Sequence, residues 1–274
     1  MAKKAEVESR IAVSPIPHVA PGYYTNEKPL EAGVRSAFGG SLISQAIVSA
    51  SETVPVGFVV FSSYTVFPRP SDSNQKTVYH VERIADGRAY ATRVVRVTQQ
   101  ARNHNQCVLV STISFQNTNI PPGNVLLNYS SPMLQLGVKP EDISPQKGFE
   151  HAKKYINDSM SVFHRRVEQS PFDWRDLDYD FAEDPTRFTM RGFFRTPPLS
   201  SDSHSTHLAA IAYASDENSM AAALFANLNQ TGNKIENLAL MASLTHNLSL
   251  RDTNARDDEW MVFERSTSWG AEGW

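Results

Sequence analysis

The segment at residues 41–50 consists mostly of small and apolar residues and carries a helical pattern. Its apolar positions recur every three or four residues and are Leu42, Ile43, Ala46, Ile47 and Ala50. Serine and alanine stand between most of them, and no charged residue lies in the segment. A helix with one face in solvent would carry charge on that face. The pattern therefore predicts a helix that other structure wraps closely.

Two later segments alternate between apolar and polar residues and are rich in Val, Tyr and Phe. They cover residues 59–67 and 78–84, and Asp86-Gly87 follows the second of them. Alternation with a period of two is typical of strands, and Asp-Gly between two such runs is a strong hairpin signal. The sequence therefore predicts an antiparallel sheet built around this hairpin.

The order of these elements repeats along the chain. The first copy runs over residues 38–116 as a glycine pair, a helix, a strand, a hairpin and a closing strand. A second series begins near Ser205, with a helix at 219–228, a strand at 238–251 and the opening of a hairpin at 260–274. Self-similarity on this scale predicts a duplicated fold unit.

The two copies align when Ser63 is set opposite His246 and Glu82 opposite Glu264. This alignment places Trp274 opposite the early part of the strand that follows the first hairpin. The second copy then lacks about twenty-five residues, which is roughly two strands of ordinary length. We expect the second copy to be incomplete.

The copies and the segment between them define four regions. They are a lead-in at 1–32, a first copy at 33–117, a linker at 118–184 and a truncated second copy at 185–274. The lead-in is punctuated by proline and holds a candidate short strand around residues 10–13. The linker ends in an acidic, tryptophan-containing stretch, PFDWRDLDYDFAED, which is typical of a solvated covering loop.

A polar interruption divides the apolar stretch of the second copy. After the strand-like RFTMRGFFR, the chain reads HLAAIAYASDENSMAAALFANL, and residues 215–218 break the apolar pattern. Such a break marks either the end of a helix or the N-cap of a new one. Asp216, which lies at the break, is therefore a candidate helix cap.

Composition and charge exclude several classes of partner. The chain has 274 residues, 41% of them hydrophobic, and a formal net charge of -3. This length accommodates one large core or two smaller ones. Lysine and arginine are scattered rather than clustered, so neither nucleic acid nor an anionic membrane is an expected partner.

Targeting signals are not evident in the sequence. It shows no signal peptide and no stretch of membrane-spanning length, and Glu-Gly-Trp at its end is not a peroxisomal address. We expect an intracellular location, either cytoplasmic or peroxisomal. The single cysteine, Cys107, opens an apolar strand, where a thiol behaves as a small hydrophobic group.

Two short motifs give no support for a metal or a cofactor. Gly39-Gly40 lacks the third glycine and the preceding strand of a dinucleotide-binding fingerprint. His204 and His207 lie three residues apart and would share a helix face, but no third metal ligand is evident. No metal and no cofactor are therefore expected.

Six dispersed segments carry a more specific signal. They are AFGGSLISQAI, SSYTVFPRPSDSNQKTVYHVERIADGR, VSTISFQ, IAYASDENS, MASLTHNLSL and EWMVFERSTSWGAEG. In this order they resemble the acyl-CoA thioesterase II family over most of the chain from about Gly33 onward. The resemblance implies an α+β fold, the double hotdog, in which each unit wraps an antiparallel sheet around a long central helix.

The resemblance also implies an activity. It is the hydrolysis of acyl-CoA thioesters to free fatty acid and coenzyme A, by water held between an aspartate, a serine or threonine, and a glutamine. The aspartate corresponds to Asp216 and the hydroxyl to Ser243, three residues before the family's histidine, His246. The glutamine belongs to a final strand that this sequence does not reach, so the resemblance implies an impaired enzyme.

Thioester hydrolysis needs such groups for physical reasons. Water is a poor nucleophile, so a carboxylate must orient it and accept its proton while hydrogen-bond donors stabilise the oxyanion. Asp216 suits the first role, and Ser243 can both donate and accept a hydrogen bond. N–H groups at a helix start would face the carbonyl oxygen of the substrate. The predicted substrate-binding residues are Phe38, Gly39, Gly40 and His246.

Each assignment has an alternative. Asp216 caps a helix, Ser243 bonds only to the backbone, or His246 is structural. For the whole chain, the alternative is a non-catalytic acyl-CoA-binding or assembly module derived from a thioesterase. A hotdog hydratase would need a His and Asp pairing that is not found. By analogy with fused hotdog proteins, a homo-oligomer is expected.

Overall fold

The computed structural model describes residues 4–33, 36–101, 104–120, 135–145, 169–232, 242–268 and 270. The chain forms two compact units. Unit 1 comprises Met1–Tyr129, Pro198–Glu217 and Ala242–Asp257. Unit 2 comprises Ser130–Pro197, Asn218–Met241 and Asp258–Trp274. Two stretches of the second half of the sequence thus fold with the first half, and the division into two copies at 33–117 and 185–274 stays a prediction.

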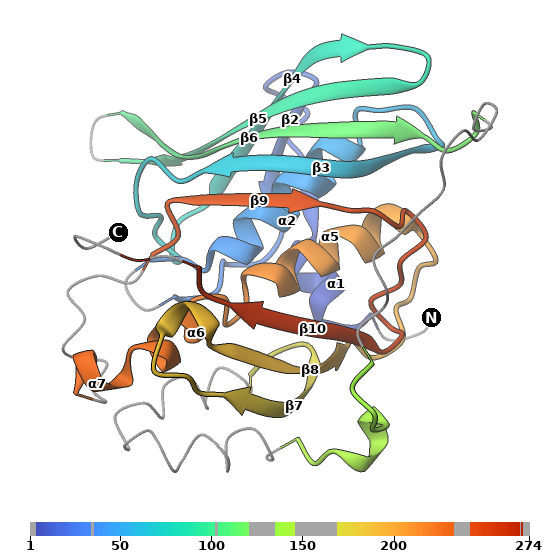
Figure 1. Ribbon diagram of the computed structural model, residues 1–274. Helices are drawn as coiled ribbons and strands as arrows, with labels where there is room; N and C mark the ends of the chain where they lie inside the picture. Colours follow the sequence, from blue (N-terminus) through green and yellow to red (C-terminus); the bar gives the residue numbers. More distant parts are fainter. Residues whose placement is uncertain are drawn as a thin grey trace. The chain divides into compact units, whose positions relative to one another are not determined.

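Unit 1 is built on an antiparallel sheet of seven strands (Figure 1). Its spatial order is β1 (Val13–Pro15), β2 (Tyr23–Asn26), β4 (Thr77–Asp86), β5 (Tyr90–Gln100), β6 (Asn105–Asn117), β3 (Phe58–Val66) and β9 (Thr245–Ser249). The hairpin predicted at Asp86-Gly87 joins β4 and β5, and Gly87 N–H donates to the Tyr90 carbonyl at 2.9 Å. The prediction of an antiparallel sheet around this hairpin is confirmed.

The helices α2 (Gly39–Ser51) and α5 (His204–Asp216) pack on this sheet (Figure 1). The short helix α1 (Glu6–Ile11) packs on α2 and α5. The apolar positions predicted for α2 are at most 1% exposed. Two of its buried serines also bond within the helix, since Ser44 Oγ donates to the Ser41 carbonyl at 3.0 Å and Ser49 Oγ donates to the Gln45 carbonyl at 2.8 Å. The prediction of a helix closely surrounded by other structure is confirmed.

The longest of these helices, α2 and α5, have 13 residues each. Within the described ranges, no helix has both the length and the apolar character needed to cross a bilayer.

The pairing of β3 with β9 follows the internal repeat. In the alignment of the two copies, Tyr64 is equivalent to Asn247, and these residues lie directly opposite each other in the ladder. The pairing continues to both sides, with Thr65 opposite His246. A strand that meets its own copy in antiparallel fashion pairs one residue with its equivalent, as in an isologous contact. The register therefore supports the duplication read from the sequence.

The long helix of the second copy differs from the prediction. It is α5, whereas the predicted helix at 219–228 corresponds only to the short α6 (Ala221–Ala226) and the start of α7 (Leu228–Thr231). The polar interruption ends α5, because Glu217 has an extended backbone and Asn218 follows with a positive φ of 56°. Asp216 is the last residue of α5, and the cap position of α6 is Met220, so the N-cap reading of Asp216 is wrong.

The N-terminal segment also differs from the prediction. The chain is helical as far as Ile11 and extended from Val13 in β1, so residues 10–13 do not form one strand. The carboxylate of Glu8 accepts hydrogen bonds from Ala5 N–H at 2.7 Å and from Ser200 Oγ at 2.7 Å. These bonds cap α1 and fix it to a distant loop of the same unit, which sequence periodicity does not reveal.

Unit 2 contains a three-stranded antiparallel sheet in the order β10 (Met261–Ser266), β8 (Thr189–Arg195), β7 (Asp173–Asp180). The strand predicted in RFTMRGFFR is β8, which confirms that prediction. Trp174 stacks on Phe194 with ring centroids 4.8 Å apart, and Arg265 lies 4.7 Å over the Trp174 ring. The acidic stretch is therefore a strand with a buried aromatic face, and its interpretation as a covering loop is wrong.

Arg93 on β5 fixes the end of α2 to the sheet of unit 1. Its side chain is fully buried and donates from Nε to Thr53 Oγ1 at 2.8 Å and from Nη2 to the Thr53 carbonyl at 3.0 Å. It also pairs with Asp86 and donates to the Ala85 carbonyl at 3.0 Å. One side chain thus satisfies several acceptors where a strand bulge meets a helix end.

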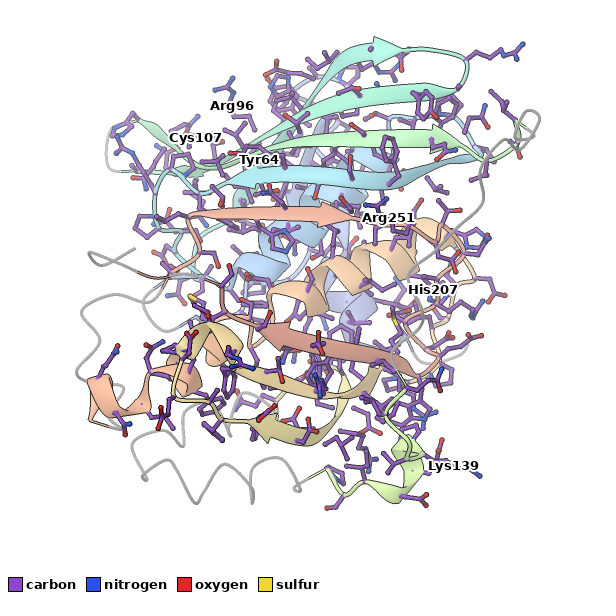
Figure 2. All side chains as sticks on the ribbon, in the orientation of Figure 1. Tyr64, Arg96, Cys107, Lys139, His207 and Arg251 are labelled. Atoms are coloured by element: carbon purple, nitrogen blue, oxygen red, sulfur yellow. The ribbon has the colours of Figure 1, made fainter. Side chains whose placement is uncertain are left out.

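We expect Arg93→Met to lower the free energy of unfolding by about 3 kcal/mol, because buried acceptors then lose their donor. Chemical denaturation measures this change. The matched control is Arg96→Met on the same strand, where the arginine side chain is 53% exposed (labelled in Figure 2). That control should change stability by less than about 0.5 kcal/mol. Equal effects of the two substitutions would contradict the role of Arg93.

Candidate active site

The structure brings Asp216 and Ser243 together within unit 1. Ser243 Oγ donates a hydrogen bond to Asp216 Oδ1 at 3.1 Å. Asp216 is 9% exposed, and Ser243 is half-buried. Residues 27 positions apart in sequence thus share one contact, and Ser243 uses its hydroxyl on a side chain rather than only on the backbone.

Asp216 and Ser243 are positioned by two different elements. Asp216 is positioned because α5 ends there, one turn after residues that pack in the core. Ser243 precedes β9, and its neighbour Leu244 extends the ladder, since Phe67 N–H donates to the Leu244 carbonyl at 3.0 Å. The hydroxyl is therefore held by sheet pairing, and the carboxylate by a helix end.

The Asp216 carboxylate lies against the start of α2. A Cβ built on Gly39 would stand 2.8 Å from Asp216 Oδ2, and one built on Gly40 would stand 2.7 Å from the Tyr213 carbonyl oxygen. A larger residue at Gly39 would displace the Asp216 carboxylate, and one at Gly40 would press on the backbone of α5. The first N–H groups of a helix have no partner within it, and the helix dipole favours negative charge there. The glycine pair thus allows a carboxylate to approach a helix N-terminus.

Phe38 is the N-cap residue of α2 and is half-buried. Its ring packs edge-to-face on Tyr213 of α5, with centroids 4.9 Å apart. The predicted substrate-binding residues Phe38, Gly39 and Gly40 therefore all lie where α2 begins beside α5. Their observed partners are side chains and backbone of α5.

His246 lies beside the same helix end. Its Nε2 is 2.9 Å from Ser215 Oγ, and Ser215 Oγ donates its own hydrogen to the Ala212 carbonyl at 2.7 Å. A hydroxyl has one hydrogen, so His246 Nε2–H must be the donor to Ser215. This assigns the neutral Nε2–H tautomer, which leaves Nδ1 as a buried acceptor with no hydrogen bond to any of the described residues.

The electrostatics of His246 are set by two opposing effects. Burial lowers the pKa of His246 from its ordinary value, and the nearby Asp216 carboxylate partly offsets this by favouring the charged form. Burial prevails, so the imidazole is neutral near neutral pH.

The set of groups at this site suits activation of water. An ionised carboxylate has several lone pairs, so it accepts hydrogen bonds from more than one donor. The start of α2 provides an electropositive end beside it. The described site contains a general-base candidate, a positioning hydroxyl and a helix N-terminus within one cluster.

Two residues of this cluster were missed by sequence reasoning. Ser215 orients His246, and Tyr213 packs on the start of α2. Tyr213 lies in the apolar run that precedes the polar break, and its only signal was its position three residues before Asp216 on a helix, which puts the two on the same side. Ser215 lies in the break itself, directly before Asp216, where nothing in the sequence sets it apart from its polar neighbours.

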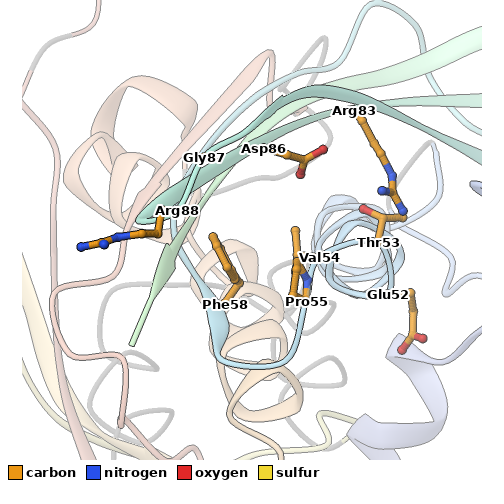
Figure 3. A pocket seen from close by; sticks show the side chains of 9 residues that line it. All are labelled: Glu52, Thr53, Val54, Pro55, Phe58, Arg83, Asp86, Gly87 and Arg88. Carbon is orange, nitrogen blue, oxygen red and sulfur yellow. The ribbon is translucent and has the colours of Figure 1, made fainter. Parts of the chain in front are cut away.

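A separate cavity lies at the other end of α2. It has a volume of about 520 Å³ and is lined by Glu52, Thr53, Val54, Pro55, Phe58, Arg83, Asp86, Gly87 and Arg88 (Figure 3). Neither Asp216 nor Ser243 lines it. In Figure 3, Arg83 extends from β4 toward Thr53, whereas Arg88 points away from the cavity. This cavity is therefore distinct from the Asp216 cluster.

The remaining sequence candidates lie elsewhere. His204 is exposed at the start of α5, whereas His207 is fully buried and its Nδ1 contacts Asp257. The two histidines therefore do not form one site, although they are three residues apart. Cys107 is half-buried on β6, and its Sγ lies 3.5 Å from the Leu109 carbonyl. Figure 2 labels His207 and Cys107.

Two family models match the sequence. The model described as the acyl-CoA thioesterase N-terminal domain matches residues 28–116. The model described as the acyl-CoA thioesterase C-terminal domain matches residues 140–274. Together they cover most of the chain and both halves of the predicted repeat.

Comparisons with individual proteins agree with the family models. The acyl-coenzyme A thioesterase 8 of Mus musculus is 25% identical over 247 residues, in a match that covers 85% of this chain and 70% of that protein. The acyl-CoA thioesterase II of Mycobacterium marinum has a TM-score of 0.70 at 22% identity, over 97% of this chain and 88% of that one. The tesB protein of Mycobacterium avium subspecies paratuberculosis has a TM-score of 0.72 at 18% identity, over 98% and 88% of the two chains. At these identities the structures show the fold, and the expected α+β double hotdog is confirmed.

We expect the pKa of His246 to lie below about 6.5, the ordinary value for histidine. Asp216→Asn should lower it further, because the carboxylate that favours the charged imidazole is removed. Two-dimensional NMR of the imidazole signals measures the titration, with His246→Gln used for assignment. A pKa that rises in Asp216→Asn would contradict the described geometry.

Proposed function

Because the chain belongs to the acyl-CoA thioesterase family, we propose that it hydrolyses acyl-CoA thioesters to a free fatty acid and coenzyme A at the Asp216–Ser243 cluster. Membership makes the chain a thioester hydrolase by class. The observation that carries the residue assignment is the hydrogen bond of 3.1 Å from Ser243 Oγ to Asp216 Oδ1, beside the start of α2.

The proposed step begins with a water molecule between Asp216 and Ser243. Asp216 accepts a proton from this water as its oxygen attacks the carbonyl carbon of the thioester. The carbonyl oxygen becomes an oxyanion, and N–H groups at the start of α2 stabilise it. The carbon–sulfur bond then breaks, and the sulfur leaves as a thiolate that takes up the proton held by Asp216. The products are a carboxylic acid and a free thiol.

The burial of Asp216 supports this role. A carboxylate that is 9% exposed has lost most of its bulk water, so the few groups around it control its basicity. Ser243 orients the carboxylate through Oδ1, which leaves the other oxygen, Oδ2, directed to the start of α2. His246 is assigned to shaping the site through Ser215 rather than to proton transfer.

The competing proposal is a non-catalytic acyl-CoA-binding or assembly module. It requires affinity for acyl-CoA without release of thiol. Three expectations stay predictions from the sequence. They are the lower rate of a site without the family's glutamine, the homo-oligomer, and the cytoplasmic or peroxisomal location.

Asp216→Asn should reduce the rate of thiol release by at least about a hundredfold, because an amide does not accept the proton of water. Release of free thiol from acyl-CoAs of several chain lengths is measured with a thiol reagent. Asp252→Asn is the matched control, since Asp252 is exposed and its carboxylate accepts a hydrogen bond from the nearby Asn254 N–H at 2.9 Å. Full activity in Asp216→Asn would exclude this assignment.

Ser243→Ala should reduce kcat by roughly ten- to a hundredfold, which corresponds to loss of one hydrogen bond to a charged group. Ser243→Thr retains the hydroxyl and should restore most of the rate. Binding of a non-hydrolysable acyl-CoA analogue, measured by calorimetry, should change little in both variants. Analogue binding by the wild-type protein with no thiol release would favour the non-catalytic module instead.

A further inference from the structure

Glu31 connects the two helices that form the candidate site. Its carboxylate accepts a hydrogen bond from the hydroxyl of Tyr213 on α5 and pairs with Arg10 of α1. Its backbone carbonyl accepts from the N–H of Phe38, the N-cap residue of α2, at 2.8 Å. One residue thus holds the last turn of α5 through its side chain and the start of α2 through its backbone.

Tyr213 transmits this contact to Asp216. The two residues are three positions apart on α5 and so lie on the same side of the helix. The Tyr213 ring packs on Phe38, and its carbonyl oxygen lies where Gly40 has no side chain. A shift of the Tyr213 hydroxyl would therefore move the turn that carries the Asp216 carboxylate.

Arg10 completes the cluster from α1. Its Nη1 donates to the Tyr213 hydroxyl at 3.0 Å, and its Nη2 donates to Glu6 at 3.0 Å. Its backbone carbonyl accepts from Gln45 Nε2 of α2 at 2.7 Å. A single arginine therefore contacts both α5 and α2.

The protonation states suit these contacts. Burial alone would lower the pKa of Arg10, but its contacts with Tyr213 and Glu31 raise it further than burial lowers it, so Arg10 stays charged. Burial and the Glu31 carboxylate raise the pKa of Tyr213, so its hydroxyl stays protonated and remains a donor. The hydrogen bond from Tyr213 to Glu31 is therefore present across the neutral pH range.

We propose that Glu31 and Tyr213 are positioning residues, which set the separation between the Asp216 carboxylate and the first turn of α2. The proposal rests on the proposed function. Groups that act on a substrate must be held within about 0.5 Å of the productive geometry. The Asp216 carboxylate already lies close against Gly39, so a small displacement of α5 changes its distance to the helix N-terminus.

A purely structural role makes a different prediction. The two helices also pack along buried apolar faces, with Leu42 of α2 and Leu208 of α5 at most 1% exposed. This packing holds the helices together without the hydroxyl of Tyr213. Removing that hydroxyl should therefore disturb the site more than the stability of the fold.

Tyr213→Phe is the principal test, because it removes the hydroxyl and retains the ring on Phe38. We expect kcat to fall about tenfold, as the hydrogen bonds of the hydroxyl to Glu31 and from Arg10 are lost, with KM changed by less than about twofold. Glu31→Gln should act in the same direction. The matched control is Tyr64→Phe, since Tyr64 is 53% exposed on β3 (labelled in Figure 2) and should leave kcat unchanged.

A double-mutant cycle separates positioning from general damage. Positioning through Asp216 requires that Tyr213→Phe cause little further loss when Asp216 is already Asn. The same fold-loss in both backgrounds would overturn the proposal. The Tyr213→Phe crystal structure supplies a readout that does not depend on activity. The proposal expects the Asp216 carboxylate to move away from the Gly39 backbone, and an unchanged position would overturn it.

Failure of the proposed function has a different outcome. A wild-type protein that binds the acyl-CoA analogue but releases no thiol would overturn hydrolysis at this site. The crystal structure of Tyr213→Phe would still decide whether Glu31 and Tyr213 position Asp216.

Discussion

The close approach of the end of α5 to the start of α2 is the constraint on which the candidate site depends. Gly39 and Gly40 permit it, because a Cβ at either position would meet Asp216 or the Tyr213 carbonyl at less than 3.0 Å. This approach places a carboxylate beside the first N–H groups of α2, which have no partner within the helix, and at the positive end of the helix dipole. A helix end that would otherwise need a capping side chain is thus available to a carboxylate from another helix, and through it to a reacting water molecule.

The polar contacts around this approach form two layers. Ser243 and Ser215 contact Asp216 and His246 directly, while Glu31, Arg10 and Tyr213 link the backbones that carry them. In the second layer Tyr213 is fully buried, and the charged Arg10 and Glu31 are half-buried, which costs desolvation energy and needs complete hydrogen bonding. Apolar packing between α2 and α5 already holds the helices together, so the charged layer is better explained by the geometry of the site than by stability.

The duplicated architecture explains why residues distant in sequence meet. Pairing of β3 with β9 joins the two copies of the repeat along one sheet, with Tyr64 opposite its equivalent Asn247. It also brings the segment before β9, which holds Ser243, to α5. The second half of the chain therefore supplies both the carboxylate and the hydroxyl, and the first half supplies the helix start. Neither half contains the whole cluster.

The sequence alone determined the wrapped helix, the hairpin at Asp86-Gly87, the repeat and, by family resemblance, the pairing of Asp216 with Ser243. These follow from local periodicity, turn chemistry and dispersed motifs. The sequence pattern placed the second long helix at the wrong residues. The reason is that α5 carries small and apolar residues on every face and therefore shows no amphipathic pattern. Only the tertiary structure decided the roles of Glu31, Arg10 and Tyr213, since their contacts span up to 203 positions in sequence. Such contacts are fixed by how helices pack, and spacing along a chain carries no information about them.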